Sequence, residues 1–165
     1  MRNTSPSSPA ARPAEGIDRL WGTSVGEDTA FLLARANAIT LAAASSAVGE
    51  FGLKVRSYSV LALAVSGERP NQRELSEFLR LDPSQIVALI DELEKRGLVR
   101  REPDAGDRRV NVVVATDEGR EIYARAREAT ERAEAQCFSA LDDADRDRLK
   151  TILRTLAAAP GASAG

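Results

Sequence analysis

The residues best suited to recognition chemistry lie in two clusters between Leu81 and Arg109. On a helix that lies in a major groove, an amide such as Gln85 can form two hydrogen bonds to adenine, and small apolar side chains can contact a thymine methyl group. A serine at such a position would contact a phosphate or a base edge. The same residues could instead form a helix surface without any contact. This first cluster, at the start of an expected helix, consists of Ser84, Gln85, Val87 and Ala88.

The second cluster, Asp107-Arg108-Arg109, follows a turn that contains Pro103-Asp-Ala-Gly106. Residues 95–109 hold six basic and three acidic residues, although the whole chain of 165 residues has a net charge of −2. Residues 69–109, by contrast, hold nine basic and nine acidic residues. The excess of basic residues within 95–109 favours a basic contact surface that is confined to this part of the chain. A solvated turn whose charges only maintain solubility is the alternative.

A third group of polar residues, Asn71, Gln72 and Arg73, opens a short expected helix. Backbone N–H groups at the start of a helix can bind phosphates, but polar residues are also ordinary at this position. Both interpretations stay open. Lys95 and Arg96, at the end of the next helix, are expected on a solvated face, with phosphate contact as the alternative.

The composition argues against an enzyme, a metal site and a bound cofactor. The chain has no His, which removes the usual general base and the commonest metal ligand. The one cysteine, Cys137, cannot form an intrachain disulfide; we expect a small hydrophobe at an interface, with a redox-sensitive thiol as the alternative. No signal peptide opens the chain, so the expected location is the cytoplasm.

Hydrophobic periodicity and capping residues place these clusters on helices and one hairpin. Residues 1–16 are rich in Pro, Ser and Ala and are expected to form a disordered tail. The pattern predicts helices over residues 27–48, 55–65, 71–80, 83–97 and 116–137 and a last one from residue 142, with strands over 98–101 and 110–115. The expected fold is mainly α with a small β-hairpin wing, that is, a winged helix-turn-helix domain plus a helical dimerisation region.

Four of these helices are expected to have an apolar face, which the third and fourth bury in the core, whereas the terminal helices carry more apolar surface than one chain can hide. The residues expected on these apolar faces are Val55, Tyr58, Leu61, Ala62 and Val65 on the second helix, Leu75, Phe78 and Leu79 on the third, Ile86, Leu89, Ile90 and Leu93 on the fourth, and Leu149, Ile152, Leu153 and Leu156 on the last.

The helix over residues 27–48 carries almost no charge, because Arg35 is the one charged residue between Thr29 and Gly49. A helix this apolar should be buried on most sides, and a chain of this length offers it little core, so an intersubunit interface is expected. A transmembrane span is the rival, which several polar residues in the helix disfavour. Arg35 could anchor a carboxylate ligand, pair with an acid across the dimer or emerge at a solvent gap. Trp21 and Tyr58 are candidate pocket-wall residues or ordinary core residues.

From Leu75 to Tyr123 the sequence resembles the MarR family of winged-helix transcriptional regulators. The resemblance is carried by the run from Leu81 to Glu94, by Arg96-Gly-Leu-Val99, by Asp107-Arg-Arg109 and by Ala115-Thr-Asp-Glu-Gly-Arg120. Two upstream pieces, over residues 31–35 and 51–61, also resemble the family, so that the match extends over residues 27–158.

The resemblance implies a homodimer with a DNA-binding lobe over residues 55–116 and dimerisation helices over residues 17–49 and 117–158. In each subunit, the helix that begins after Asp82 would enter a major groove of a pseudo-palindromic operator, and the wing would reach a minor groove. Asp107 would hold Arg109 by a charge-assisted pair, Arg109 would enter the minor groove, and Arg108 would face a phosphate. Relatives often carry Thr and Arg where Val87 and Ala88 stand, so the base sequence is not predicted.

We therefore expect a cytoplasmic, sequence-specific DNA-binding regulator without a membrane partner. Family members are commonly repressors that a small, often aromatic or anionic, ligand releases from DNA, and Trp21, Arg35 and Tyr58 are the candidate ligand residues. The alternative is a winged-helix protein interaction module without DNA binding. The neutral charge of residues 69–109 and the missing basic side chain at Ala88 support that alternative.

Overall fold

The computed structural model describes residues 15–159, which fall into two units with the boundary after Ile39. The first unit contains α1 (Glu15–Trp21), α2 (Ser24–Glu27) and the first part of α3 (Thr29–Gly49). Residues 1–14 of the expected tail lie outside the described residues, and Glu15 and Gly16 already belong to α1, so the expected boundary was two residues too late. The sequence did not predict α1 and α2, because seven and four residues are too few for a helical period to show.

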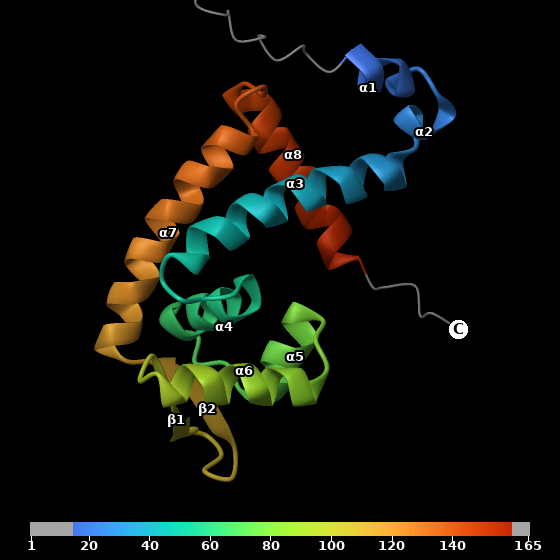
Figure 1. The fold of residues 1–165 in the computed structure, drawn as a ribbon. Coiled ribbons are helices and arrows are strands. Elements are labelled where there is room, and N and C mark those ends of the chain that lie inside the picture. The colour runs from blue at the N-terminus through green and yellow to red at the C-terminus, as the bar shows by residue number, and fades with distance from the viewer. Residues whose placement is uncertain (1–14, 160–165) are drawn as a thin grey trace, which may run out of the picture. The chain divides into compact units, whose positions relative to one another are not determined.

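The second unit contains five helices and a hairpin within its described residues (Figure 1). The antiparallel hairpin pairs Val99 with Ala115 at its base and Pro103 with Asn111 near its tip. Mainly helical architecture with one hairpin confirms the expected fold class. The elements are α4 (Val55–Val65), α5 (Gln72–Leu79), α6 (Pro83–Lys95), β1 (Val99–Pro103), β2 (Asn111–Ala115), α7 (Asp117–Cys137) and α8 (Asp143–Ala158).

Local capping explains why these helices begin where they do. At the start of α5, Asn71 Oδ1 accepts the N–H of Glu74 at 3.0 Å, and Glu74 Oε2 accepts the N–H of Asn71 at 2.8 Å. These two bonds form a reciprocal capping box. Thr116 caps α7 and Asp142 caps α8, as predicted from the sequence.

The core of the second unit lies around α4, which packs against α6, α7 and β2. Ile86, Ile90 and Leu93 of α6 are buried as predicted, while Leu89 is half-buried. The face predicted for α4 is confirmed in part: Leu61 is fully buried, and Val55, Tyr58 and Val65 are partly buried against the core. The centre of the buried face lies about one position earlier in the sequence than predicted. The buried residues of α4 are Ser57, Val60, Leu61 and Ala64.

Phe78 of α5 was expected in the core but is 75% exposed. Successive residues of a helix are about 100° apart, so Phe78 and Leu79 lie on opposite sides of the buried Leu75. The core covers Leu75 fully and Leu79 partly, which leaves Phe78 in solvent.

Gly119, in the first turns of α7, marks a close approach between that helix and Leu98, the residue directly before β1. A Cβ atom at this position would lie 1.9 Å from the carbonyl oxygen of Leu98. Thr116 Oγ1 accepts the N–H of Gly119 at 3.0 Å and donates to the carbonyl of Gly97 at 2.6 Å. The absence of a side chain at Gly119 therefore allows α7 to pack directly against the base of the hairpin.

The apolar helix α3 is exposed along most of its length in one chain, which agrees with the expectation that a single chain offers it little core. Ala47 and Val48 are its buried residues, and both lie at its C-terminal end. Of the helices described between residues 15 and 159, α3 alone is long and apolar enough to cross a membrane. The last helix, α8, also exposes apolar side chains, with Leu156 58% exposed.

Candidate nucleic-acid interface

The N-terminal half of α6 presents the first predicted cluster to solvent. Ser84, Gln85 and Ala88 are exposed, and Val87 is half-buried. Pro83 stands at the first helical position, and Gln85 Oε1 accepts the N–H of Asp82 at 3.3 Å. The amide oxygen of Gln85 thus takes part in capping α6.

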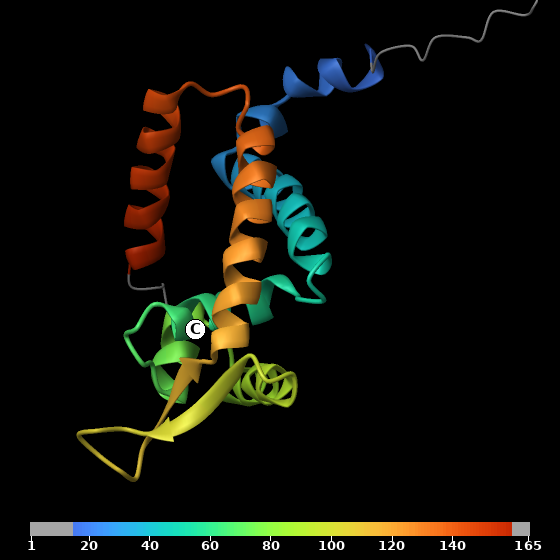
Figure 2. The same ribbon diagram turned by 90° about the vertical axis from the view of Figure 1, so that its left-hand side faces the viewer.

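The tip of the hairpin is ordered by two carboxylates. Asp104 Oδ1 accepts the N–H groups of Gly106 at 2.8 Å and Asp107 at 3.0 Å. These hydrogen bonds, with that of Asp107 the larger cause, hold the pKa of the Asp104 carboxyl below its ordinary value. The hairpin extends away from the helices at this tip (Figure 2).

Asp107 and Arg109 form the pair that the resemblance implied. Nε and Nη2 of Arg109 each donate to one oxygen of Asp107 at 3.0 Å, and the backbone N–H of Arg109 donates to Asp107 Oδ1 at 3.1 Å. The side-chain hydrogen bonds from Arg109 lower the pKa of the Asp107 carboxyl. The Arg109 side chain is nevertheless 90% exposed, so this pair holds the guanidinium in solvent at the edge of the wing.

A groove of about 630 Å³ connects the start of α5, the start of α6 and the hairpin. Asn71, Gln72 and Arg73 line it together with Arg109, so the structure brings two of the three predicted polar clusters to one concave surface. The N–H of Val113 donates to the carbonyl of Pro70 at 2.9 Å and fixes β2 beside the start of α5.

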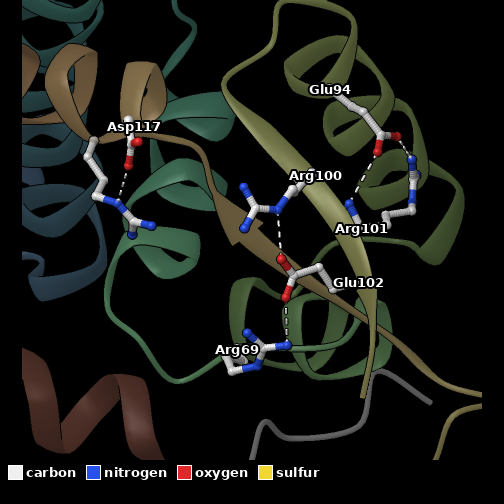
Figure 3. Close-up of polar contacts among 7 residues, drawn as sticks. Arg69, Glu94, Arg100, Arg101, Glu102 and Asp117 are labelled. Atoms are coloured by element: carbon white, nitrogen blue, oxygen red, sulfur yellow. Dashed lines mark hydrogen bonds and ion pairs between the residues drawn. The ribbon is translucent and has the colours of Figure 1, made fainter. Parts of the chain in front are cut away.

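Most arginines around this groove already have partners in the same chain. Glu102 accepts hydrogen bonds from Arg69 at 2.8 Å and from Arg100 at 2.7 Å (Figure 3). Arg73 is paired with Glu77 at 2.8 Å. In the described part of the chain no ion pair engages Arg108, which is exposed. The basic charge predicted from the sequence is thus largely balanced within the lobe.

Arg96 does not lie on a solvated face as expected. Its guanidinium donates to the carbonyls of Gly52 at 2.7 Å and Phe51 at 2.9 Å and so fastens the end of α6 to the loop that precedes α4. The neighbouring Lys95 is exposed, as predicted.

Two of the three candidate ligand residues meet in the first unit. The Arg35 guanidinium lies 5.2 Å from the centroid of the Trp21 ring, a distance that permits a cation–π interaction. Both residues line a pocket of about 270 Å³ whose other walls include Leu20 and Phe31. Arg35 is exposed and is therefore not a charge enclosed by its own chain.

Tyr58, the third candidate, belongs to the second unit. Its ring stacks on that of Tyr123 with centroids 5.6 Å apart, and its hydroxyl lies 3.3 Å from Thr130 Oγ1. Burial, more than any other effect, raises the pKa of the Tyr58 hydroxyl. Tyr58, a residue of α4, is thus half-buried against α7, where it packs with one polar contact.

Comparison with known proteins identifies the lobe that contains these clusters. The sequence model of the MarR family matches residues 51–110, from the loop before α4 to the tip of the wing. The crystal structure of a MarR-family transcriptional regulator from Rhodococcus sp. RHA1 is 37% identical and covers 84% of this chain and 100% of its own, with a TM-score of 0.78. This chain belongs to the MarR family. The sequence resemblance and the winged-helix fold are both confirmed.

Other similar proteins of known structure include CouR from Rhodococcus jostii RHA1 bound to p-coumaroyl-CoA. It is 39% identical, with 85% of this chain and 99% of that chain covered and a TM-score of 0.78. CouR bound to a 23-mer DNA duplex is 31% identical over 83% of this chain and 96% of that one, with a TM-score of 0.75. A putative transcriptional regulatory protein for the hcr operon of Thauera aromatica is 29% identical over 99 residues, and the match spans 60% of the length of either protein.

The sequence did not single out two residues that shape this MarR-type lobe. Asp104 orders the wing tip, and Arg101 of β1 contacts carboxylates of α6. The dipeptide Asp104-Ala105 before Gly106 was a local signal for the first, since Asp often caps a turn. No local signal exists for the second, because the facing residues are seven and ten positions away.

Proposed function

We propose that this MarR-family protein is a sequence-specific DNA-binding repressor. The observation that carries the proposal is the groove between α5, α6 and the wing, flanked by the exposed start of α6 and by the exposed Arg109. An exposed helix beside a projecting hairpin suits DNA binding, because the helix can enter a major groove while the hairpin reaches the adjacent minor groove. The DNA-bound CouR, 31% identical over most of the chain, supports the same function.

The residue roles follow from this arrangement. Ser84, Gln85, Val87 and Ala88 would face base edges, and Asn71, Gln72 and Arg73 would contact phosphates from the start of α5. Asp107 would orient Arg109 toward a minor groove, and Arg108 would contact a phosphate. The lobe proposed for these roles spans residues 55–116.

We further propose that the protein acts as a homodimer in the cytoplasm, on a pseudo-palindromic operator with half-sites about one helical turn apart. The support is the apolar surface that α3 and α8 expose in a single chain, which includes Leu33 and Leu156. Large apolar side chains exposed along a helix are typical of a surface that another chain covers. Dimerisation helices over residues 17–49 and 117–158 would cover it, and α3 then needs no membrane.

A small aromatic or anionic effector would release the repressor from DNA. The pocket beside Trp21 and Arg35 combines an aromatic wall with an exposed cation, which suits an aromatic anion. CouR, 39% identical, is bound to p-coumaroyl-CoA, a ligand that has both an aromatic ring and negative charge. A thermal-shift screen of aromatic acids and their CoA thioesters, repeated with operator DNA, tests this part of the proposal.

The decisive test is a gel shift with DNA from the promoter region of the protein's own gene, repeated at increasing salt. Affinity should fall steeply between 50 and 200 mM salt, by about a hundredfold or more, because phosphate contacts release counterions. Absence of binding, or a flat salt response, would support the alternative of a winged-helix protein interaction module. The internally balanced charge of the lobe is the observation that favours this alternative.

A further inference from the structure

Arg101 of β1 is held between two carboxylates of the recognition helix α6. Nη2 of Arg101 lies 2.5 Å from Asp91 Oδ1, Nη1 contacts Glu94 Oε2, and the backbone N–H of Arg101 donates to Glu94 Oε1 at 3.2 Å (Figure 3 shows the contact with Glu94). Asp91 and Glu94 are three residues apart and therefore lie on one face of the helix. We refer to Arg101, Asp91 and Glu94 as the wing clamp.

The wing clamp differs from an ordinary surface ion pair in its geometry and its burial. The Arg101 side chain is 27% exposed, and its planar guanidinium meets a different carboxylate with each terminal nitrogen. Burial disfavours the charge of Arg101, but the hydrogen bonds and negative charges of Asp91 and Glu94 outweigh it and raise the pKa of the guanidinium. The contact is thus directed by geometry, with the arginine largely buried and the Asp91 and Glu94 side chains 58% and 39% exposed.

The position of the wing clamp decides what it restrains. The hairpin leaves α6 at Gly97, whose positive φ of 73° turns the chain back, and this turn is a natural pivot. Arg101 lies four residues further along, about 13 Å of extended chain from that pivot. The buried base of the hairpin and the bond from Val113 to Pro70 attach the wing to the rest of the lobe. The wing clamp adds a direct contact between β1 and α6 and so restrains the angle between the wing and α6.

The opposite face of β1 makes no contact of this kind with α6. Successive side chains of a strand point to opposite faces, so Glu102 faces away from Arg101 and pairs with Arg100 and Arg69 instead (Figure 3). Arg100 is therefore a matched comparison for Arg101: an adjacent arginine on the same strand, also paired with a carboxylate, but not attached to α6.

We propose that Arg101 is a positioning residue for DNA binding, which keeps the wing at the angle where Arg109 and the start of α6 reach adjacent grooves of the same duplex. The proposal rests on the DNA-binding function proposed above. When two contacting elements are rigidly connected, the second contact forms at high effective concentration, and this advantage is lost when the connection loosens. Without the wing clamp, Arg109 should therefore contribute much less to affinity.

A double-mutant cycle on operator affinity tests the proposal in the full-length protein. The variants are Arg101→Gln, Arg109→Ala and their combination, with Arg100→Gln and its combination with Arg109→Ala as the matched set. We expect Arg109→Ala to weaken binding at least about tenfold in the wild type and less than about threefold in the Arg101→Gln background. In the Arg100→Gln background Arg109→Ala should still cost the full tenfold, because Arg100 and Arg109 share no partner and the effects of the two substitutions should add.

A second background guards against misfolding of Arg101→Gln. In Asp91→Ala with Glu94→Ala the arginine keeps its charge and loses both carboxylate partners, so nonspecific attraction to DNA should rise while the effect of Arg109→Ala again shrinks. Arg101→Lys, which keeps the charge without the planar fork, should restore the effect of Arg109→Ala only partly. Melting temperatures of all variants identify those that fold.

The outcomes separate this proposal from the proposed function. If Arg109→Ala costs the same factor in the wild type, in Arg101→Gln and in the doubly neutralised background, DNA binding stands and the positioning role of Arg101 is wrong. If the wild-type protein does not bind its operator at any salt concentration, both proposals are wrong.

Discussion

Arg109 lies at the tip of the wing with its guanidinium held by Asp107 and 90% of its side chain in solvent. An exposed ion pair of this kind contributes little to folding stability, because water and salt screen the two charges. What the pair does contribute is direction, because the two-point contact limits the rotamers of a long side chain. We therefore interpret the Asp107–Arg109 pair as preparation for binding and not as structural support.

Substitution Arg109→Ala should weaken operator binding at least about tenfold, as expected for loss of a minor-groove arginine, without change in melting temperature. Fluorescence anisotropy with labelled operator and a thermal melt measure the two quantities. Arg56→Ala, at an exposed position of α4 that does not line the groove, is the control for loss of one positive charge. Equal affinities of the wild type and Arg109→Ala would remove the wing from the mechanism.

Arg35 is the corresponding residue for the effector. Its exposed guanidinium above Trp21 is available to an anionic ligand, whereas no observation connects it with the proposed DNA surface. Arg35→Ala should abolish ligand-induced release while DNA affinity stays unchanged. The measurement is a gel shift titrated with the ligand found in the thermal-shift screen, and release at the wild-type ligand concentration would contradict the role.

Among the elements, α7 and the hairpin are joined most closely at Gly119. The distance of 1.9 Å from a Cβ at this position to the Leu98 carbonyl is far below any tolerated contact, and the atom it meets is backbone. The helix would have to shift away from the base of the wing to accommodate a methyl group. The requirement for glycine here is therefore one of space, since α7 could otherwise accept alanine without strain.

Gly119→Ala should accordingly destabilise the fold by about 3 kcal/mol, the upper end for overpacking, although alanine is the better helix former. Gly49→Ala is the matched control, because Gly49 ends α3 and no atom lies within 4 Å of its Cβ position. Urea denaturation of both variants compares the free energies of unfolding. A Gly119→Ala variant as stable as Gly49→Ala would show that the two elements separate easily.

For the whole molecule, the main question is what covers the apolar residues that one chain exposes. Ile152 of α8 is 49% exposed and Leu156 58%, and α3 is exposed along most of its length. Burial of such side chains contributes about 25 cal/mol per Å² of apolar area. A dimer in which each copy covers both helices of the other would therefore be strongly stabilised. This argument supports the proposed homodimer.

Leu156→Asp should therefore shift the protein toward monomer and weaken operator binding, because two linked half-site contacts bind more tightly than one. Analytical ultracentrifugation gives the mass, and a gel shift gives the affinity. Phe78→Asp is the control for the mass measurement: Phe78 is even more exposed but lies on α5, outside the proposed dimerisation helices, so this variant should remain a dimer. A dimer that survives Leu156→Asp would place the interface elsewhere.

Much of this protein was predictable because its signals are local. Asn71, Asp82, Thr116 and Asp142 stand at the starts of helices, and a capping side chain acts on backbone only two or three residues away. The Asp107–Arg109 pair spans two residues, so its motif was sufficient to predict it. Local patterns of this kind predicted the bounds of α4 and the presence of the hairpin. The motifs of the wing and of the helix before it indicated membership of the MarR family.

Tertiary packing decided the features that join distant parts of the chain. Phe78 is exposed because the core covers the other side of α5, and Arg96 donates to carbonyls 44 and 45 residues away. Arg101 meets Asp91 and Glu94 only because the hairpin folds back along α6. The sequence determined which residues could contact DNA, whereas the distance and angle between α6 and the wing depend on contacts between elements, which no local pattern specifies.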